Sequence, residues 1–302
     1  MKYAVNYSPL LAELVQAGLV SIDFYKCPAW PDLLTEAIKT LPVYIHFPLS
    51  IGYGEGNVMD EETHQPADLE RFARMMDETG TPFINTHFIA PAETYANIPP
   101  ESRASHHIRR VLDGAIRDLE PLIHRFGAEK VLVENIINEH NWLTACALPD
   151  VISSLISETG CGFLFDLSHA RLTAEKIGMD AHEYIAGLPM DKMCEGHVTG
   201  LKTLEGGLLE MILAVGDPYD MVSSQAGKRI DHLPMEEEDW PELAWLIEGI
   251  DRGKFRDPWV MAFEYGGVGH FWEELTDRDI YLTQLPLMAS MLHEGGNHKA
   301  TR

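Results

Sequence analysis

The chain has 302 residues, of which 45% are hydrophobic, so a disordered protein is excluded and one large domain or two ordinary ones fit. Its 47 acidic and 23 basic residues give a formal net charge of −24, which disfavours nucleic acid or an anionic membrane as partner. No apolar run approaches the ~20 residues of a membrane span. Four scattered cysteines and a poor secretion signal predict reduced thiols and a cytoplasmic location.

In the first half of the chain, short runs rich in β-branched and aromatic residues predict strands at 3–8, 21–26, 43–48, 82–88 and 130–136. Apolar residues spaced three and four apart predict helices at 66–79 and 102–126. Pro66 and Gly80 are placed as the first helical residue and the residue after the end of the earlier helix.

The second half continues the alternation, with strands predicted at 162–169, 193–200 and 259–266. Helices are predicted at 150–159, 240–250 and 277–293. The acidic run 236–239 is interpreted as the first turn of the second of these helices, because carboxylates favour the positive end of a helix dipole.

Eight strands alternating with helices predict a single α/β domain over residues 1–302 with the (β/α)8 TIM-barrel fold. An open doubly wound sheet is the alternative, but no Gly-rich fingerprint follows the first strand. Two long loops are expected, at 49–65 and 201–235. The glycines of 52–56 suggest a phosphate cradle, but Glu55 and the lack of a lysine there favour a flexible loop or lid.

Ionisable side chains interrupt the apolar strands near their carboxyl ends, where TIM-barrel active sites lie. These candidate metal ligands are His46, His87, Glu134, Asp166, His169, His197 and Glu264, joined by Asp231 and His232 from the loop after the seventh strand. Buried carboxylates need counter-charge, and few basic residues lie at these strand ends, so divalent cations are predicted. Nine candidates exceed the roughly four to six ligands of one ion, which predicts two or three ions, with iron favoured and zinc or manganese as alternatives.

Three smaller expectations accompany this set. Asp166 and His169 are three residues apart, so they can face one site only if the chain turns after Asp166, and a helix is expected from about residue 172. Asn135 is expected to orient Glu134. Asn138 and His140 are interpreted as polar loop residues.

These residues, in this order, resemble the xylose isomerase-like TIM-barrel superfamily over about residues 20–267. The motifs that carry the resemblance are IHF, THF, VENI, FDLSH, GH, IDHLP and FE. The set is most similar to the multinuclear non-haem iron-dependent oxidases, which modify peptides with two or three irons. The resemblance implies an oxidase acting on a small-molecule or peptide substrate. Asp231 and His232 depart from it, because these oxidases separate the pair by one residue, so either side chain can be the ligand.

Two other branches of the superfamily are open alternatives. Sugar isomerases and epimerases would use Glu134, Asp166, His197 and Glu264 around one ion, with Glu134 and Glu264 as the catalytic acid–base pair. Endonuclease IV uses three zinc ions and has a similar Asp-x-x-His motif, but it must hold a DNA backbone, which an acidic chain disfavours. A non-catalytic metal-binding barrel is a hypothesis of a different class.

Overall fold

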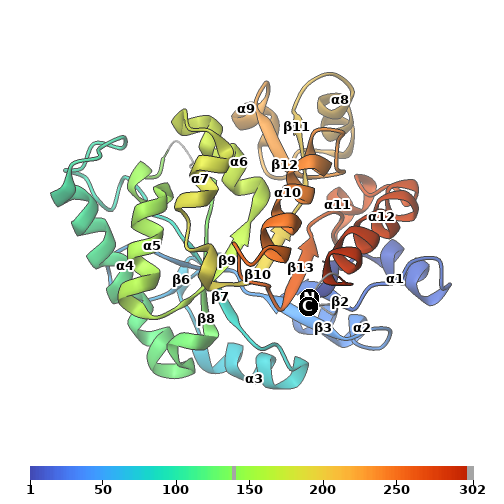
Figure 1. The fold of residues 1–302 in the computed structure, drawn as a ribbon, viewed down its shortest axis with the longest axis horizontal. Coiled ribbons are helices and arrows are strands. Elements are labelled where there is room, and N and C mark those ends of the chain that lie inside the picture. The colour runs from blue at the N-terminus through green and yellow to red at the C-terminus, as the bar shows by residue number, and fades with distance from the viewer. Residues whose placement is uncertain (138–140, 298–302) are drawn as a thin grey trace. The chain divides into compact units, whose positions relative to one another are not determined.

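The computed structural model describes residues 1–137 and 141–297, so Asn138 and His140 lie outside the described residues. The chain divides into two compact units. Unit 1 consists of Met1–Tyr44 and His197–Arg302, and unit 2 consists of Ile45–Gly196. The elements of both are labelled in Figure 1. Along the sequence, unit 1 ends and unit 2 begins within β3 (Val43–His46), and unit 2 ends and unit 1 resumes within β10 (Met193–Val198).

Three parallel strands form the sheet of unit 1. The central strand β1 (Lys2–Asn6) pairs with β2 (Phe24–Pro28) on one side and with β13 (Val260–Phe263) on the other. Ala4 lies in register with Ala262 on one side and with Phe24 on the other. These strands are largely buried, as their mostly apolar sequences predict.

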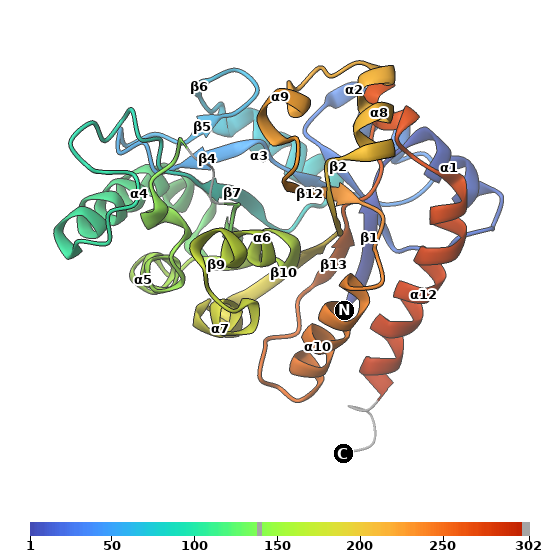
Figure 2. The same ribbon diagram turned by 90° about the horizontal axis from the view of Figure 1, so that it is seen from above.

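Two helices of unit 1, α1 (Pro9–Gln16) and α2 (Pro31–Ala37), begin at a proline, and α1 also has a side-chain cap. The first, α1, follows Ser8, whose hydroxyl accepts a hydrogen bond from the N–H of Leu11. The others outside the 201–235 segment are α10 (Asp239–Asp251), α11 (His270–Glu274) and α12 (Arg278–Asn297). Figure 2 shows α10 and α12 side by side.

The long loop predicted at 201–235 is instead a folded insertion, so that prediction was wrong. Strands β11 (Gly200–Thr203) and β12 (Arg229–Leu233) pair antiparallel, and α8 (Gly206–Val215) and α9 (Met221–Gln225) connect them. Four buried residues of the insertion, Leu204, Ile212, Ile230 and Leu233, form a core cluster together with Phe271 of α11 (His270–Glu274). The elements of the insertion are too short to produce a clear apolar period in the sequence.

Unit 2 is built on four parallel strands in the order β9 (Gly162–Asp166), β8 (Val131–Glu134), β7 (Ile84–Phe88) and β4 (Leu49–Ile51). Two short strands, β5 (Met59–Asp60) and β6 (Gln65–Pro66), extend the sheet antiparallel from β4. The segment 49–65, predicted as a loop, therefore contains residues of three short strands, and the prediction was wrong in that respect.

The predicted strand 43–48 ends early because the backbone is interrupted at Phe47. The side chain of Asn85 accepts a hydrogen bond from the N–H of Phe47 at 2.8 Å and donates one to its carbonyl at 3.2 Å. Pro48 follows and has no N–H to continue the ladder. The chain then resumes as β4.

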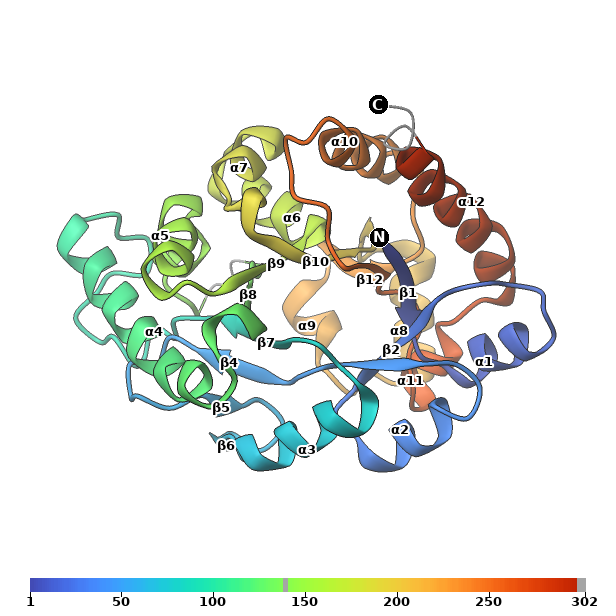
Figure 3. The same ribbon diagram turned by 60° about the horizontal axis from the view of Figure 1, so that its bottom comes forward.

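The helices of unit 2 are α3 (Leu69–Thr79), α4 (Ser105–Phe126), α5 (Pro149–Thr159), α6 (Leu167–Ile177) and α7 (Ala181–Gly187), with 3-10 turns at Ala128–Lys130, Thr144–Ala147 and Met190–Lys192. Figure 3 shows α4 and α5 side by side. Pro66 does not begin α3, because Asp68 caps it by accepting from the N–H of Arg71. Gly80 ends α3 at φ +70°, as predicted.

Each of the eight predicted strands and five predicted helices overlaps an observed element of its type. Of the acidic run 236–239, only Asp239 lies within α10, and its buried carboxylate accepts from the N–H groups of Glu236 and Leu201. Within the described ranges, no helix has both the length and the apolar character that crossing a bilayer requires. The four cysteines all lie within those ranges as buried thiols outside any disulfide.

The Gly-rich loop at 52–56 is neither a phosphate cradle nor a loose lid. The buried carboxylate of Asp118, on α4, accepts hydrogen bonds from the N–H groups of Gly52, Gly54 and Gly56 at 2.9, 2.8 and 2.7 Å. The donors that a phosphate would use are therefore bound to an internal anion. Asp118 is 62 to 66 residues away from these glycines, so the loop sequence alone does not reveal this partner.

Candidate metal centre

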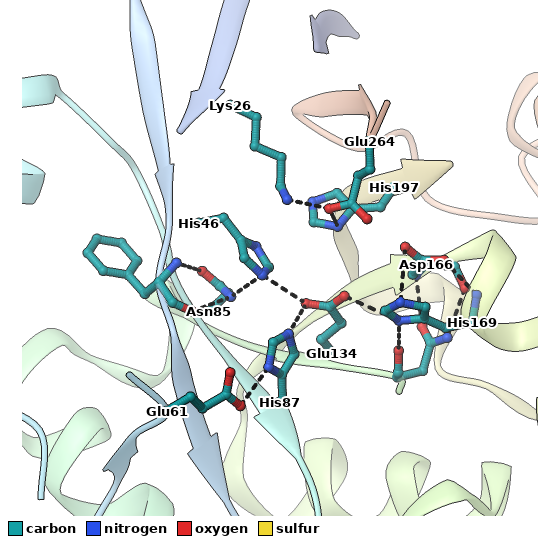
Figure 4. A network of polar contacts seen from close by, with 12 residues as sticks. Lys26, His46, Glu61, Asn85, His87, Glu134, Asp166, His169, His197 and Glu264 are labelled. Carbon is teal, nitrogen blue, oxygen red and sulfur yellow. Dashed lines mark hydrogen bonds and ion pairs between the residues drawn. The ribbon is translucent and has the colours of Figure 1, made fainter. Parts of the chain in front are cut away.

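Two imidazoles and one carboxylate meet at strand ends in unit 2, as Figure 4 shows. His87 and Glu134 are in register on β7 and β8, which places them on the same face of the sheet. Oε2 of Glu134 lies 3.2 Å from Nε2 of His87 and 3.7 Å from Nε2 of His46. The three side chains offer ligand atoms that all lie within 4.8 Å of one another. Such a set suits iron, zinc or manganese.

Glu61 supports this group, although it was not among the residues predicted from the sequence. Its Oε1 lies 2.8 Å from Nδ1 of His87, so the ring is held with Nε2 toward Glu134. Burial lowers the pKa of His87, but the carboxylates of Glu61 and Glu134 outweigh that effect and raise the pKa to about 10. The raised pKa reflects local negative charge, which also attracts a metal cation. Glu61 stands in an acidic stretch of an expected loop, so no pattern singled it out.

The chain turns directly after Asp166, as predicted, and this turn brings Asp166 and His169 close together. Helix α6 begins at Leu167, five residues earlier than expected, since Oδ1 of Asp166 accepts a hydrogen bond from the N–H of His169 at 2.7 Å. Nδ1 of His169 donates to the carbonyl of Asn135 at 3.0 Å and lies 3.5 Å from Oε1 of Glu134. With Nδ1 as the donor, the neutral ring of His169 has its lone pair on Nε2.

Asn135 has a different role from the expected one. Its side chain accepts from the N–H of Asp166 at 2.9 Å and donates to the carbonyl of Asp166 at 2.8 Å. It therefore fixes the backbone at the end of β9, and the hydrogen bonds of its amide group go to Asp166 instead of Glu134. The amide is fully buried, which explains why both of its polar atoms need partners.

In unit 1, Glu264 follows β13 and forms the second group with Lys26 and His197 (Figure 4). Oε1 of Glu264 contacts Nζ of Lys26 and lies 3.0 Å from Nδ1 of His197. Burial raises the pKa of Glu264, but the charges of Lys26 and His197 hold it well below its usual range. The expectation that these strand ends lack basic residues overlooked Lys26. A lysine inside a buried strand was itself a signal, because it needs a partner.

His232 joins this group from β12. Its Nδ1 lies 3.2 Å from the carbonyl oxygen of Glu264 and 4.0 Å from Oε2 of the same residue. His232 has a φ of +59°, an unfavourable conformation for a residue with a side chain. Asp231 precedes it on the same strand and is half-buried. The metal roles of all nine candidates stay predictions.

Residues 26–215 match the model of a family described as "RiPP precursor modification enzyme MbnB/TglH/ChrH". A curated relative is a UPF0276 protein of Chromobacterium violaceum, which is 25% identical over 220 residues, covering 68% of this chain and 74% of the relative.

Two solved structures have similar folds. D-psicose 3-epimerase, solved in the presence of D-fructose, matches with a TM-score of 0.50 and 12% identity, over 96% of this chain and 97% of the epimerase. A xylose isomerase-like TIM barrel/4-hydroxyphenylpyruvate dioxygenase fusion protein matches with a TM-score of 0.53 and 13% identity, over 100% of this chain and 44% of the fusion. These similarities assign the chain to the α/β class with a xylose isomerase-like TIM-barrel fold, as the sequence predicts.

Proposed function

The chain belongs to the RiPP precursor modification enzyme MbnB/TglH/ChrH family, and from this membership we propose that it is an iron-dependent oxidase acting on a ribosomally made precursor peptide. The observation that carries the iron assignment is the approach of His46 and His87 to the buried carboxylate of Glu134. Imidazole and carboxylate donors together are the ligands typical of non-haem iron.

We assign one ion to unit 2. His46, His87 and Glu134 are the proposed ligands, with Asp166 and His169 next to them. Glu61 orients His87 through Nδ1, the arrangement by which carboxylates commonly hold a ligating histidine. The negative charges of Glu61 and Glu134 raise the pKa of His87, and a bound metal cation would neutralise these charges.

We assign a second ion to unit 1. His197, His232 and Glu264 are its proposed ligands, with Asp231 as a further candidate on β12. This group differs from the first because Lys26 already supplies positive charge to Glu264. A cation there shares the carboxylate with an ammonium, so we expect weaker binding than in unit 2.

Bound iron supplies the dioxygen and electron-transfer chemistry that oxidation of a peptide residue needs. The chain's own contribution is to bind and orient. In unit 2, hydrogen bonds to Glu61 and to the Asn135 carbonyl fix which nitrogen His87 and His169 present. In the isomerase alternative, Glu134 and Glu264 would be the acid–base pair.

The test is to reconstitute the protein with Fe(II) without air and to measure iron per chain by elemental analysis and anomalous scattering. We expect at least two irons, and about one fewer in His87→Ala and in Glu134→Gln. His124→Ala is the matched control, because His124 is exposed in the last turn of α4. Activity is read as iron- and dioxygen-dependent mass changes in a library of cysteine-containing peptides.

Other outcomes identify the alternatives. Unchanged iron content in His87→Ala contradicts the ligand assignment in unit 2. A single bound Mn, Mg or Co ion with turnover of a ketose supports an isomerase or epimerase. Iron binding with no mass change in any peptide supports a non-catalytic metal-binding protein.

A further inference from the structure

A cavity of about 530 Å³ lies at the folded insertion of unit 1. Its walls are residues 215–219, which follow α8, and residues 268–272, which lead into α11. This volume is within the range of pockets that hold small ligands or single side chains with their backbone. Figure 1 locates α8 and α9 beyond the ends of β11 and β12. We call this cavity the insertion pocket.

Three aromatic rings line the insertion pocket. The ring centroid of Tyr219 lies 5.4 Å from that of Phe271 and 6.0 Å from that of Trp272, and the latter two rings are 5.1 Å apart. Tyr219 is 57% exposed, although it belongs to this cluster. An exposed ring at the edge of an aromatic cluster offers a face to a ligand, and ring faces attract cations.

The lining of the pocket carries one carboxylate. Asp217 is its acidic residue, His270 is also present, and none of the lining residues is a lysine or an arginine. Asp217 lines the pocket, and its two carboxylate oxygens accept from the N–H groups of Met221 and Val222, both at 2.7 Å. These bonds hold its negative charge in place. Aromatic rings beside a fixed carboxylate form a site complementary to a cation.

The pocket also adjoins the metal-ligand candidates of unit 1. The ring of Trp272 lies 6.0 Å, edge to face, from the ring of His232. His232 in turn contacts Glu264. Trp272 therefore both lines the insertion pocket and contacts His232 of this group.

We propose that the insertion pocket binds a lysine or arginine side chain of the precursor peptide, with the cation against Tyr219 and Trp272 and near Asp217. This inference rests on the proposed function, because it names the chemistry of the peptide that the enzyme would take. It adds a recognition site at a segment that the sequence suggested was a loop.

The test uses the full chain and titrates it with N-acetyl-lysine N-methylamide. N-acetyl-norleucine N-methylamide is the matched probe, because it has a similar carbon chain without the ammonium. Binding is measured by calorimetry and by tryptophan fluorescence. We expect the norleucine probe to bind about fivefold more weakly, as loss of a partly desolvated cation–π contact implies. Equal binding of the two probes would mean a purely apolar pocket and would overturn the proposal.

Variants locate the binding. Tyr219→Ala and Asp217→Asn should each weaken the lysine probe by roughly three- to fivefold. Leu213→Ala is the control, because Leu213 is 55% exposed on α8 and does not line the pocket. Circular dichroism checks that each variant is folded. Binding that Tyr219→Ala leaves unchanged overturns the proposal, as does the absence of binding by either probe.

The same titration separates this inference from the proposed function. It is made on metal-depleted protein and on protein loaded with Fe(II). If the lysine probe binds selectively but no iron is retained, the proposed function fails and the pocket stands. If iron is retained and peptides are oxidised but the probe does not bind, the pocket assignment fails alone.

Discussion

The ammonium of Lys26 contacts Oε1 of Glu264, and the side chains are only 7% and 4% exposed. The same oxygen lies 3.0 Å from Nδ1 of His197. A carboxylate removed from water in this way depends on its partners, because an uncompensated buried charge is far less favourable than a paired one. The pair therefore contributes to stability as well as to the candidate metal site.

Lys26→Met should lower the free energy of unfolding by about 3–5 kcal/mol, because it leaves the Glu264 carboxylate buried beside a thioether. Urea denaturation measures this loss. Lys39→Met is the matched control, since Lys39 pairs with Glu36 on the surface, where both side chains are more than half exposed. That control should lose less than about 1 kcal/mol. The double variant Lys26→Met/Glu264→Gln should recover part of the loss, and equal effects of the two lysine variants would contradict the argument.

Glu61→Gln should weaken iron binding in unit 2 by about 10- to 100-fold, because the carboxylate that orients His87 becomes a neutral amide. Titration with Fe(II) under anaerobic conditions measures the affinity, and excess iron should restore the stoichiometry. Glu78→Gln, on the exposed side of α3, is the control. If both variants bind iron like the unchanged protein, Glu61 has no part in orienting His87.

Asp118→Ala should destabilise the protein by about 3 kcal/mol or more, because three buried or partly buried N–H groups lose a charged acceptor at once. Hydrogen exchange is the direct measurement, and the amides of Gly52, Gly54 and Gly56 should exchange faster. Asp113→Ala on the exposed side of α4 should leave their exchange unchanged. Protection of these amides in Asp118→Ala would show that another group holds the loop.

The buried cysteines should react slowly with thiol reagents. Burial raises the pKa of the Cys27 and Cys146 thiols to about 12. At pH 8 the reactive thiolate is then roughly one part in ten thousand at each site, and its share rises tenfold for each pH unit. Ellman's reagent should label these cysteines slowly between pH 7 and 9 and rapidly in urea. Rapid labelling of the folded protein at pH 7 would contradict this burial.

Much of the fold was predictable because continuous apolar strands and periodic helices leave strong signals. The ends of the helices were less predictable than their positions. Pro66 suggested the start of α3, but Asp68 provides a side-chain cap and Pro66 instead pairs in β6. The insertion at 201–235 was missed because its strands and helices are short and bury only a few residues each. Local patterns cannot show that these residues form one cluster.

For the site, the sequence supplied the strand-end histidines and carboxylates, since each interrupts an apolar run. It did not supply Glu61, which contacts His87 from 26 residues away within an acidic stretch. Lys26 could have been found, because a lysine in a buried strand demands an anion. Asn135 was noticed but given the wrong partner, since the direction of an amide side chain is a matter of tertiary packing.

Given the φ of +59° at His232, stability and the proposed metal-binding role make opposite demands at this position. Glycine adopts that backbone conformation without strain, whereas a residue with a Cβ pays about 1 kcal/mol or more. A chain selected for robustness alone would therefore favour glycine there. His232→Gly would therefore be a natural choice in engineering the protein for heat resistance. The same substitution would remove the imidazole that contacts both Glu264 and Trp272.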